Sequence, residues 1–388
     1  METFTVFKFT ALLKNSAKGF RNLYNTYKLL ESRNKSRVVI LVKVFINGYG
    51  NIGRRLASAL ALDKEIQLVG VAKYSIDDKV KEALENRYDV YVPKEAIANF
   101  KERGYNVTGS IEEAIERCDL VVDAAKEGVG YDNKKNLYEP MNKPAIFQGG
   151  EERNGERAVA DMIHNSRVNY DKAAGKTYVI QGSCNVSGMG RVMQPLIQKF
   201  GDRIGRFDIE LVRRWADLED TKAVKDSIEW DRNPHHQDDV KDFIPNANLY
   251  VDAFKVPSRM MHLHQMFVRF SDGGVPTKDE ILECFRDEFG VAIISSANGT
   301  GDVRKKALEL GFPHGDTNMV HIHQDILRVQ DDTVKIAYSD DQTGMVIPEN
   351  HLLIQSMVFR RSRDEALRKA DNLFQMSKRR AILEEEFK

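Results

Sequence analysis

The feature that most limits the possible folds of this chain is a run of β-branched residues followed directly by a glycine-rich turn. Residues 38–46, VVILVKVFI, are apolar along nearly their whole length, as expected of a parallel strand covered on both faces. Gly48, Gly50 and Gly53 follow as G-x-G-x-x-G before a helical pattern. In this context the glycines permit a tight turn, close approach of a pyrophosphate, and close helix–strand packing. The pattern predicts a dinucleotide-binding turn, with a purely structural glycine turn as the alternative.

Strand and helix patterns alternate along the first half of the chain. The helical patterns at 77–87 and 110–118 each lie between apolar strand patterns. Alternation at this spacing indicates βαβ units with right-handed crossovers, and therefore an α/β domain with a doubly wound parallel sheet of the Rossmann type. The further strands expected in this sheet are 66–74, 119–125, 143–150 and 177–182.

The second half of the chain has a different pattern of predicted elements. Long strand patterns such as 206–217 and 260–270 stand between irregular polar stretches, which predicts a second α+β domain with a mainly antiparallel sheet. The amphipathic C-terminal segment has a break near Arg361 and is expected to be a helix that returns to the first domain. The expected organisation is an N-terminal extension at 1–36, a dinucleotide-binding domain at 37–183 and 346–388, and a catalytic and oligomerisation domain at 184–345.

Composition and charge restrict the classes of partner. The chain of 388 residues carries 58 basic and 58 acidic residues, and a formal charge of zero argues against general nucleic-acid or membrane binding. Three widely spaced cysteines without a CxxC indicate neither a disulfide framework nor a thiolate zinc site, and they favour a reducing cytoplasm. No apolar run approaches the roughly 20 residues of a membrane span. The basic segment 1–36 is interpreted as an extension, with a partner-binding arm or a transit peptide as alternatives.

Cys184 lies where a strand pattern passes into a helical pattern. The N-terminus of a helix favours a thiolate over a thiol, and the thiolate is the reactive form. Backbone amides at this junction, together with Asn185, could hold an oxyanion. A free cysteine can also act as a small buried hydrophobe, which is the role expected of Cys118 and Cys284 in their helical patterns. We predict that Cys184 is a nucleophile.

A thiol nucleophile needs a base, and its substrate needs charged contacts. His235 and His236 fall in a polar segment from which an imidazole can reach a site on another element. Arg213 and Arg214 end a strand pattern. Arginine is well shaped for phosphate groups, so contact with phosphate or cofactor is predicted, with a salt-bridged strand edge as the alternative.

Two further histidine pairs lie in strand patterns. His262 and His264, and likewise His321 and His323, are two residues apart and point to one face of a strand. This spacing can bind a metal, but no third ligand is apparent and thiol chemistry does not require one. We expect histidines that are satisfied within half-buried strands, and no metal site.

The end of the second strand bears on the choice of cofactor. An NAD-selective site would place an acidic residue here to hold the ribose 2′-hydroxyl. This chain instead has Lys73 and, two residues later, Ser75. A positive charge and a hydroxyl can accept a 2′-phosphate, so NADP is predicted to serve at least as well as NAD. A solvated lysine after the strand is the alternative.

Several motifs along the chain together resemble one family. The motifs are VKVFINGYGNIGRR, AIFQGGE, SCNVSG, RRWAD, HHQDD, VPSRMMHLHQM and VIPEN. They occur in the same order and at similar spacing as in the archaeal-type (type II) phosphorylating glyceraldehyde-3-phosphate dehydrogenases, and the resemblance runs from about Val42 to the C-terminal helix. It implies a cytoplasmic homotetramer that uses NAD or NADP to convert glyceraldehyde 3-phosphate and inorganic phosphate to 1,3-bisphosphoglycerate in glycolysis or gluconeogenesis.

The resemblance also implies roles for individual residues. Cys184 and His236 correspond to the catalytic pair. The family's cofactor contacts correspond to Asn51, Ile52, Gly150, Arg213 and Gln342, to which the glycine turn and the end of the second strand add Gly48, Gly50, Gly53 and Lys73. The family's substrate contacts correspond to Ser183, Cys184, Asn185 and His236. Substrate contacts are also expected at Gln237, next to His236, and at Arg214.

The chain departs from the family pattern around the expected substrate site. Gln237 replaces a glycine after the histidine pair, and Val186 and Ser187 replace two threonines. The segment between RRWAD and HHQDD is shorter than usual, and the extension at 1–36 is not part of the pattern. These differences bear on which aldehyde is the substrate.

The leading interpretation is a phosphorylating aldehyde dehydrogenase. Cys184 adds to the aldehyde, hydride passes to the nicotinamide, and phosphate cleaves the resulting thioester. His236 would take the protons of the thiol and the hemithioacetal, with a pKa near the working pH. One alternative is a related dehydrogenase of another phosphorylated sugar aldehyde or a semialdehyde. Another is a nucleotide-binding regulator that uses Cys184 as a redox sensor.

Overall fold

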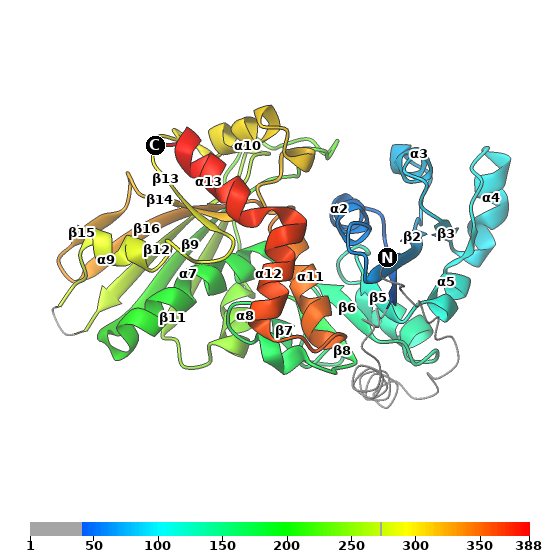
Figure 1. Ribbon diagram of the computed structural model, residues 1–388, viewed down its shortest axis with the longest axis horizontal. Helices are drawn as coiled ribbons and strands as arrows, with labels where there is room; N and C mark the ends of the chain where they lie inside the picture. The colour runs from blue at the N-terminus through cyan, green and yellow to red at the C-terminus, as the bar shows by residue number, and fades with distance from the viewer. Residues whose placement is uncertain (1–40, 272–273) are drawn as a thin grey trace, which may run out of the picture. The chain divides into compact units, whose positions relative to one another are not determined.

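The computed structural model describes residues 41–271 and 274–388, which form two compact units (Figure 1). The predicted extension at 1–36 and the first residues of the predicted first strand lie outside this part of the chain. The first unit comprises the described residues up to His164, Asp171–Gln181 and Leu353–Ala366. The second unit comprises Asn165–Tyr170, Gly182–Leu352 and Leu367–Lys388.

The first unit is built on a parallel sheet of eight strands in the order β4-β3-β2-β1-β5-β6-β8-β7. Every pairing in this sheet is parallel, which confirms the predicted doubly wound fold. All residues of β5 are buried, in keeping with a strand covered on both faces. The strands are β1 Val42–Asn47, β2 Ile66–Ala72, β3 Val90–Val92, β4 Gly109–Ser110, β5 Leu120–Asp123, β6 Ala145–Gln148, β7 Ile163–His164 and β8 Tyr178–Gln181.

The helices of the first unit have identifiable start signals. Asp77 caps α3 by accepting the Lys79 backbone N–H. Ser110 and Glu113 form a capping box at the start of α5. The chain reverses its winding between β1 and β5, and such switch points are where α/β sheets bind ligands. The helices are α2 Asn51–Leu60, α3 Asp78–Glu85, α4 Ile97–Glu102, α5 Ile111–Arg117 and α6 Gly130–Asn133.

The second unit contains a mixed sheet in the order β10-β11-β9-β12-β16-β14-β13, with β15 paired to β16. Only the β9/β11 and β13/β14 pairings are parallel, so the sheet is mainly antiparallel, as predicted. The long helix α7 packs against β9 and β16 (Figure 1). The strands are β9 Ile204–Arg214, β10 Glu229–Trp230, β11 Leu249–Val256, β12 His262–Phe270, β13 Val291–Ile294, β14 Val320–His323, β15 Arg328–Gln330 and β16 Thr333–Asp340. The helices are α7 Cys184–Phe200, α8 His236–Phe243, α9 Lys278–Glu283 and α10 Thr300–Glu309.

The C-terminal segment forms three helices. They are α11 Val346–Met357, α12 Arg363–Phe374 and α13 Met376–Glu386. Left-handed backbone at Arg360 and Gln375 separates them, so the break expected near Arg361 is present and a second one follows. Leu353–Ala366 belongs to the first unit, and the residues after it belong to the second. No helix of the described chain is long and apolar enough to cross a membrane.

Candidate active site

The glycine turn between β1 and α2 has the geometry that its spacing predicts. Gly48 has a φ of +124°, and a Cβ there would lie 2.4 Å from the Ala124 carbonyl oxygen. A Cβ on Gly53 would lie 1.9 Å from the Gly48 carbonyl oxygen, so only glycine lets α2 approach this closely. Gly50 caps α2, and a Cβ there would meet no atom within 4 Å. The turn therefore leaves open space beside the first amides of a helix, which fits a dinucleotide pyrophosphate.

The residues predicted to select the cofactor are hydrogen bonded to other side chains of the protein. Lys73 is buried, and its Nζ lies 2.7 Å from both carboxylate oxygens of Asp77. Ser75 donates a longer hydrogen bond, 3.4 Å, to the same carboxylate. Asn51, the first residue of α2 and followed by Ile52, accepts a hydrogen bond of 2.9 Å from Lys79 Nζ. The positive charge expected to meet a 2′-phosphate is thus paired with Asp77, a contact that the strand pattern did not reveal.

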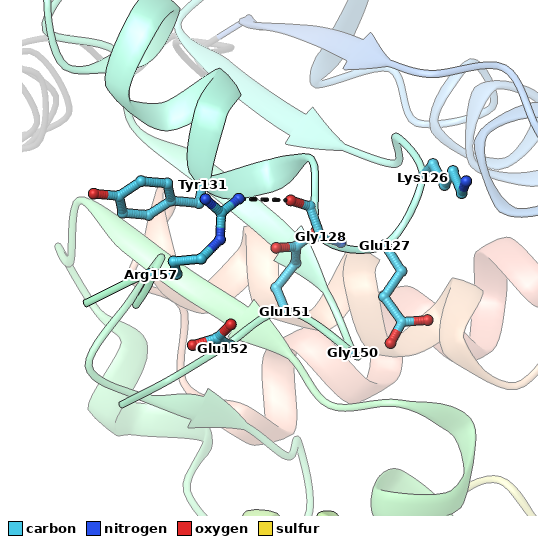
Figure 2. Close-up of a pocket in the computed structure, with 8 residues that line it drawn as sticks. All are labelled: Lys126, Glu127, Gly128, Tyr131, Gly150, Glu151, Glu152 and Arg157. Carbon is cyan, nitrogen blue, oxygen red and sulfur yellow. Dashed lines mark hydrogen bonds between the residues drawn. The ribbon is translucent and has the colours of Figure 1, made fainter. Parts of the chain in front are cut away.

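A cavity of about 360 Å³ lies where β5 and β6 end in the first unit (Figure 2). Gly150, predicted to contact the cofactor, lines it, as does Glu151. The Glu151 carboxylate accepts the backbone N–H groups of Gly128 and Gly130 at 2.8 and 3.1 Å, while burial raises the pKa of Glu151. Arg157 donates to the Gly128 carbonyl oxygen at 3.1 Å, the dashed contact in Figure 2. This position, at the carboxyl ends of parallel strands, is where such sheets hold ligands.

Cys184 is the first residue of α7, at the junction of strand and helix that the sequence predicts. Ser183 caps the helix, with its Oγ accepting the Val186 N–H at 3.4 Å. The Cys184 side chain is partly exposed, yet burial raises the pKa of its thiol above the usual value. The Asp340 carboxylate adds to this rise in pKa, and Arg214 opposes it. The free protein therefore holds Cys184 as a thiol, because burial and a neighbouring anion outweigh the helix N-terminus.

His236 begins α8 and lies beside the residue that follows the thiol. Its side chain is 2% exposed, and its Nε2 lies 3.2 Å from Asn185 Nδ2. An amide nitrogen only donates, so Nε2 is the acceptor of this hydrogen bond. Burial, assisted by the neighbouring His235 and Arg213, lowers the pKa of His236 to about 2. The imidazole is therefore neutral at ordinary pH, rather than titrating near it as the sequence suggests. Gln237 is the next residue of α8.

The two arginines at the end of β9 are paired with carboxylates. Arg213 donates to Asp231 at 3.2 Å, and Arg214 pairs with Asp217. This is the salt-bridged strand edge considered as the alternative to phosphate contact. Arg214 nevertheless stands close enough to Cys184 to lower the pKa of its thiol.

Strand pairing adds to the site a carboxylate that the sequence analysis missed. His262 on β12 pairs directly with Asp340 on β16, and His264 pairs with Tyr338. Residues opposite each other in an antiparallel pair share a face, so the two histidines and Asp340 lie together. Sulfur of Cys184, a ring nitrogen of His262 and a carboxylate oxygen of Asp340 all lie within 4.8 Å of one another. Period-two patterns reveal the faces of each strand but not that these two strands pair.

This cluster is arranged for hydrogen bonding. Cysteine, histidine and aspartate also occur in metal sites, but a neutral imidazole has only one lone pair. In His262 that lone pair, at Nδ1, accepts the Arg214 backbone N–H at 3.0 Å. The other nitrogen of His262 therefore carries a proton. Burial lowers the pKa of His262 well below its usual value, which keeps the ring neutral.

The remaining residues singled out by the sequence lie in the core of the second unit. His321 and His323 on β14 share the Ser339 hydroxyl, at 3.2 and 3.0 Å, while His321 Nε2 has no hydrogen-bond partner among the described residues. Gln342 follows β16 and is buried, and its Oε1 has no hydrogen-bond partner within the part of the chain that the structure describes. Val186 and Ser187 are fully buried in α7. These two departures from the family pattern thus lie within the packed helix.

Comparison with known proteins agrees with the resemblance seen in the motifs. No protein-family model matches the chain. It is similar to the glyceraldehyde-3-phosphate dehydrogenase of Pyrobaculum calidifontis, with 33% identity over 320 residues that cover 80% of this chain and 90% of the relative. The enzyme of the same name from Sulfolobus acidocaldarius is 33% identical over 348 residues, 88% of this chain and 99% of the relative. The enzyme of that name from Archaeoglobus fulgidus is 33% identical over 338 residues, which cover 85% of this chain and 96% of the relative. The chain therefore belongs to the archaeal-type glyceraldehyde-3-phosphate dehydrogenase family.

Proposed function

We propose that this protein oxidises glyceraldehyde 3-phosphate to 1,3-bisphosphoglycerate with NAD or NADP and inorganic phosphate, through a thioester on Cys184. One observation carries the proposal. Cys184 stands at the N-terminus of α7, and Asn185 beside it is hydrogen bonded to the neutral, buried His236. A nucleophile, a potential oxyanion donor and a base thus come together on two elements of one unit.

The residues of the chain divide the chemistry as follows. The sulfur of Cys184 attacks the aldehyde carbon, and Asn185 with the first amides of α7 stabilises the oxyanion that forms. Neutral His236 accepts the proton of the hemithioacetal hydroxyl at Nε2. Because Nε2 accepts a hydrogen bond from Asn185 in the free protein, that hydrogen bond must break first. Attack of phosphate on the thioester then releases Cys184. Ser183, Gln237 and Arg214 are the proposed further substrate contacts.

The first unit is proposed to hold the cofactor. Gly48 and Gly53 form a cradle that a Cβ would fill, and the space beside Gly50 fits a pyrophosphate. When bound there, the nicotinamide cofactor supplies a hydride acceptor. The proposed contacts in this unit are Gly48, Gly50, Asn51, Ile52, Gly53, Lys73 and Gly150. Arg213 and Gln342, which are also proposed to contact the cofactor, belong to the second unit.

To bind the 2′-phosphate of NADP, Lys73 must either release Asp77 or contact Asp77 and the phosphate together. We propose that NADP is used at least as well as NAD. The family resemblance also supports a homotetramer, a cytoplasmic location and a role in glycolysis or gluconeogenesis.

A related dehydrogenase of another phosphorylated sugar aldehyde or a semialdehyde is the second candidate. The Gln237 departure beside His236 favours keeping it, because this position adjoins the proposed base. The redox-sensor alternative is less well supported. Sensor cysteines have a low pKa and are accessible, whereas burial raises the pKa of Cys184.

A spectrophotometric assay at about 340 nm with glyceraldehyde 3-phosphate, phosphate and either cofactor tests the proposal. We expect turnover that Cys184→Ser abolishes, because a hydroxyl is far less acidic than a thiol, while cofactor affinity stays within a few-fold. Cys284→Ser is the matched control, since Cys284 is also partly exposed, and it should keep full activity.

The base is tested separately. His236→Ala should lower turnover by about 10²–10⁴-fold, the usual share of general acid–base catalysis, yet still form an acyl adduct on Cys184 when phosphate is omitted. Mass spectrometry detects this adduct. Full activity of Cys184→Ser, or no adduct in His236→Ala, would refute the covalent mechanism.

A further inference from the structure

Asp340 is a buried carboxylate with one unpartnered oxygen, in the cluster that contains the Cys184 thiol. Its side chain is fully buried, and Oδ2 lies 3.1 Å from His264 Nε2. Oδ1 has no hydrogen-bond partner among residues 41–271 and 274–388. A buried carboxylate with an unpartnered oxygen is costly, and such groups are rare unless they serve a function.

The position of Asp340 restricts how Cys184 can lose its proton. One Asp340 oxygen lies within 4.8 Å of Cys184 Sγ. Two negative charges this close in a buried site oppose each other, so a thiolate beside an ionised Asp340 is strongly disfavoured. If the proton moves from sulfur to Asp340 instead, the site keeps a single negative charge. Arg214, whose charge lowers the pKa of the thiol, can then stabilise that charge on sulfur.

We propose that Asp340 is the proton acceptor of the Cys184 thiol, and that His264 positions its carboxylate. Once the sulfur and the carboxylate come within hydrogen-bond distance of each other, the S–H bond breaks and an O–H bond forms on Asp340. The freed electron pair on sulfur forms the C–S bond with the aldehyde carbon, and the carbonyl π electrons pass to oxygen. That oxygen takes up the proton held by Asp340, which regenerates the carboxylate. The aldehyde step rests on the proposed function, whereas the proton transfer within the free protein does not.

His236 is less suited to take the thiol proton. Burial and the nearby Arg213 disfavour a charged imidazole, and they lower the pKa of His236 to about 2. Its Nε2 also holds the Asn185 side chain. The geometry thus separates the two proton transfers, with the thiol proton going to Asp340 and the later hydroxyl proton to His236.

Other titratable groups near Cys184 and Asp340 could also change the pH dependence of Cys184 reactivity. Burial holds His262 neutral and raises the pKa of Tyr338 well above its usual value, so neither changes charge near neutral pH. His264 bonds Asp340 and needs its own variant. The titratable or charged groups around the pair are Tyr338 on β16, His262 and His264 on β12, Arg214 on β9 with Asp217 after it, and His236 on α8.

Alkylation by iodoacetamide, without substrate or cofactor, tests the proposal. The rate of Cys184 modification is followed by mass spectrometry in a Cys284→Ser background. Proton transfer from Cys184 to Asp340 leaves the number of protons bound by the protein unchanged. The alkylation rate should therefore vary less than about threefold between pH 6 and 8. Without an internal acceptor, thiolate is formed by release of the proton to solvent, and the rate should rise about tenfold for each pH unit.

Three variants sharpen the test. Asp340→Asn removes the acceptor, so its alkylation rate should rise about tenfold per pH unit below the thiol pKa. His264→Gln keeps a donor for Asp340 without an imidazole, and its profile should stay flat. Asp332→Asn is the matched control, because it removes an exposed carboxylate next to the start of the same strand, and its profile should also stay flat.

A steep pH profile in the unmodified protein would show that Asp340 acts only as a like charge, and would overturn the proposal. A flat profile in Asp340→Asn would overturn it as well. If Asp340→Asn does not fold, a steep profile in the unmodified protein still overturns the proposal. His236→Ala, which removes the other internal acceptor, should then keep a flat profile, and a steep one would also overturn the proposal. In active protein, Asp340→Asn should slow acyl-enzyme formation by about 10²-fold or more. Flat alkylation in a protein that does not oxidise glyceraldehyde 3-phosphate would refute the proposed function and leave the role of Asp340 standing.

Discussion

At the scale of single residues, the proposed use of NADP concerns the contact between Lys73 and Asp77. A lysine alone would attract the 2′-phosphate of NADP, but this lysine is buried and bound at 2.7 Å by both oxygens of Asp77. The carboxylate both occupies the cation and repels a second anion. The two residues therefore act on a 2′-phosphate in opposite senses, and we expect the balance between them to determine how well NADP competes with NAD.

Asp77→Asn tests this balance. We expect the ratio of kcat/KM for NADP to that for NAD to rise about tenfold, because the substitution removes the negative charge that occupies Lys73. Helix α3 should be retained, since asparagine caps helices as well as aspartate does. Asp78→Asn, in the first turn of the same helix, is the control and should leave the ratio unchanged. An unchanged ratio in Asp77→Asn would show that the pair does not govern selectivity.

The start of helix α2 gives a matched pair of variants at the scale of one element. A Cβ on Gly50 would meet no atom within 4 Å, so Gly50→Ala should keep the melting temperature within about 2 °C. It should still weaken cofactor binding at least tenfold, because the methyl group enters the space expected for the pyrophosphate. Gly53→Ala places a Cβ 1.9 Å from the Gly48 carbonyl, so it should lower both the melting temperature and the affinity. Calorimetry measures both quantities, and undiminished binding in Gly50→Ala would contradict the assignment.

Elements defined by local patterns were predictable, and contacts between distant elements were not. The β1–α2 turn and the start of α7 at Cys184 follow from apolar runs, glycines and the change from a strand pattern to a helical pattern. Asp340 was missed because the pairing of β12 with β16 joins residues far apart in the chain. The second break in the C-terminal segment was missed because Gln375 adopts a left-handed backbone without being glycine. Burial also favours the thiol of Cys184 where a thiolate was expected, and it lowers the pKa of His236 far below the expected working pH. Neither effect could be predicted, because burial depends on the whole unit.

For the whole molecule, buried histidines link stability to pH. Burial lowers the pKa of His321 to about 3, and it also lowers the pKa values of His323 and His262. The unfolded chain binds a proton at each of these histidines below about pH 6.5, while the folded protein does not. Their stabilising contribution is therefore complete above pH 6.5 and decreases as the pH falls towards the folded pKa. Buried carboxyls such as Asp123, whose pKa is raised, act in the opposite sense at lower pH.

The melting temperature should accordingly fall between pH 7.5 and pH 5.0, a range above most of the carboxyl titration. Each histidine that stays neutral in the folded state contributes up to about 1.4 kcal/mol per pH unit below pH 6.5. His321→Gln retains a group able to hydrogen bond the Ser339 hydroxyl but has no proton to gain, so its melting temperature should fall less steeply. His235→Gln is the control, because the His235 side chain is 50% exposed, and it should follow the unmodified protein. Differential scanning calorimetry at several pH values decides, and an equally steep decline in His321→Gln would show that this histidine is not held neutral by the fold.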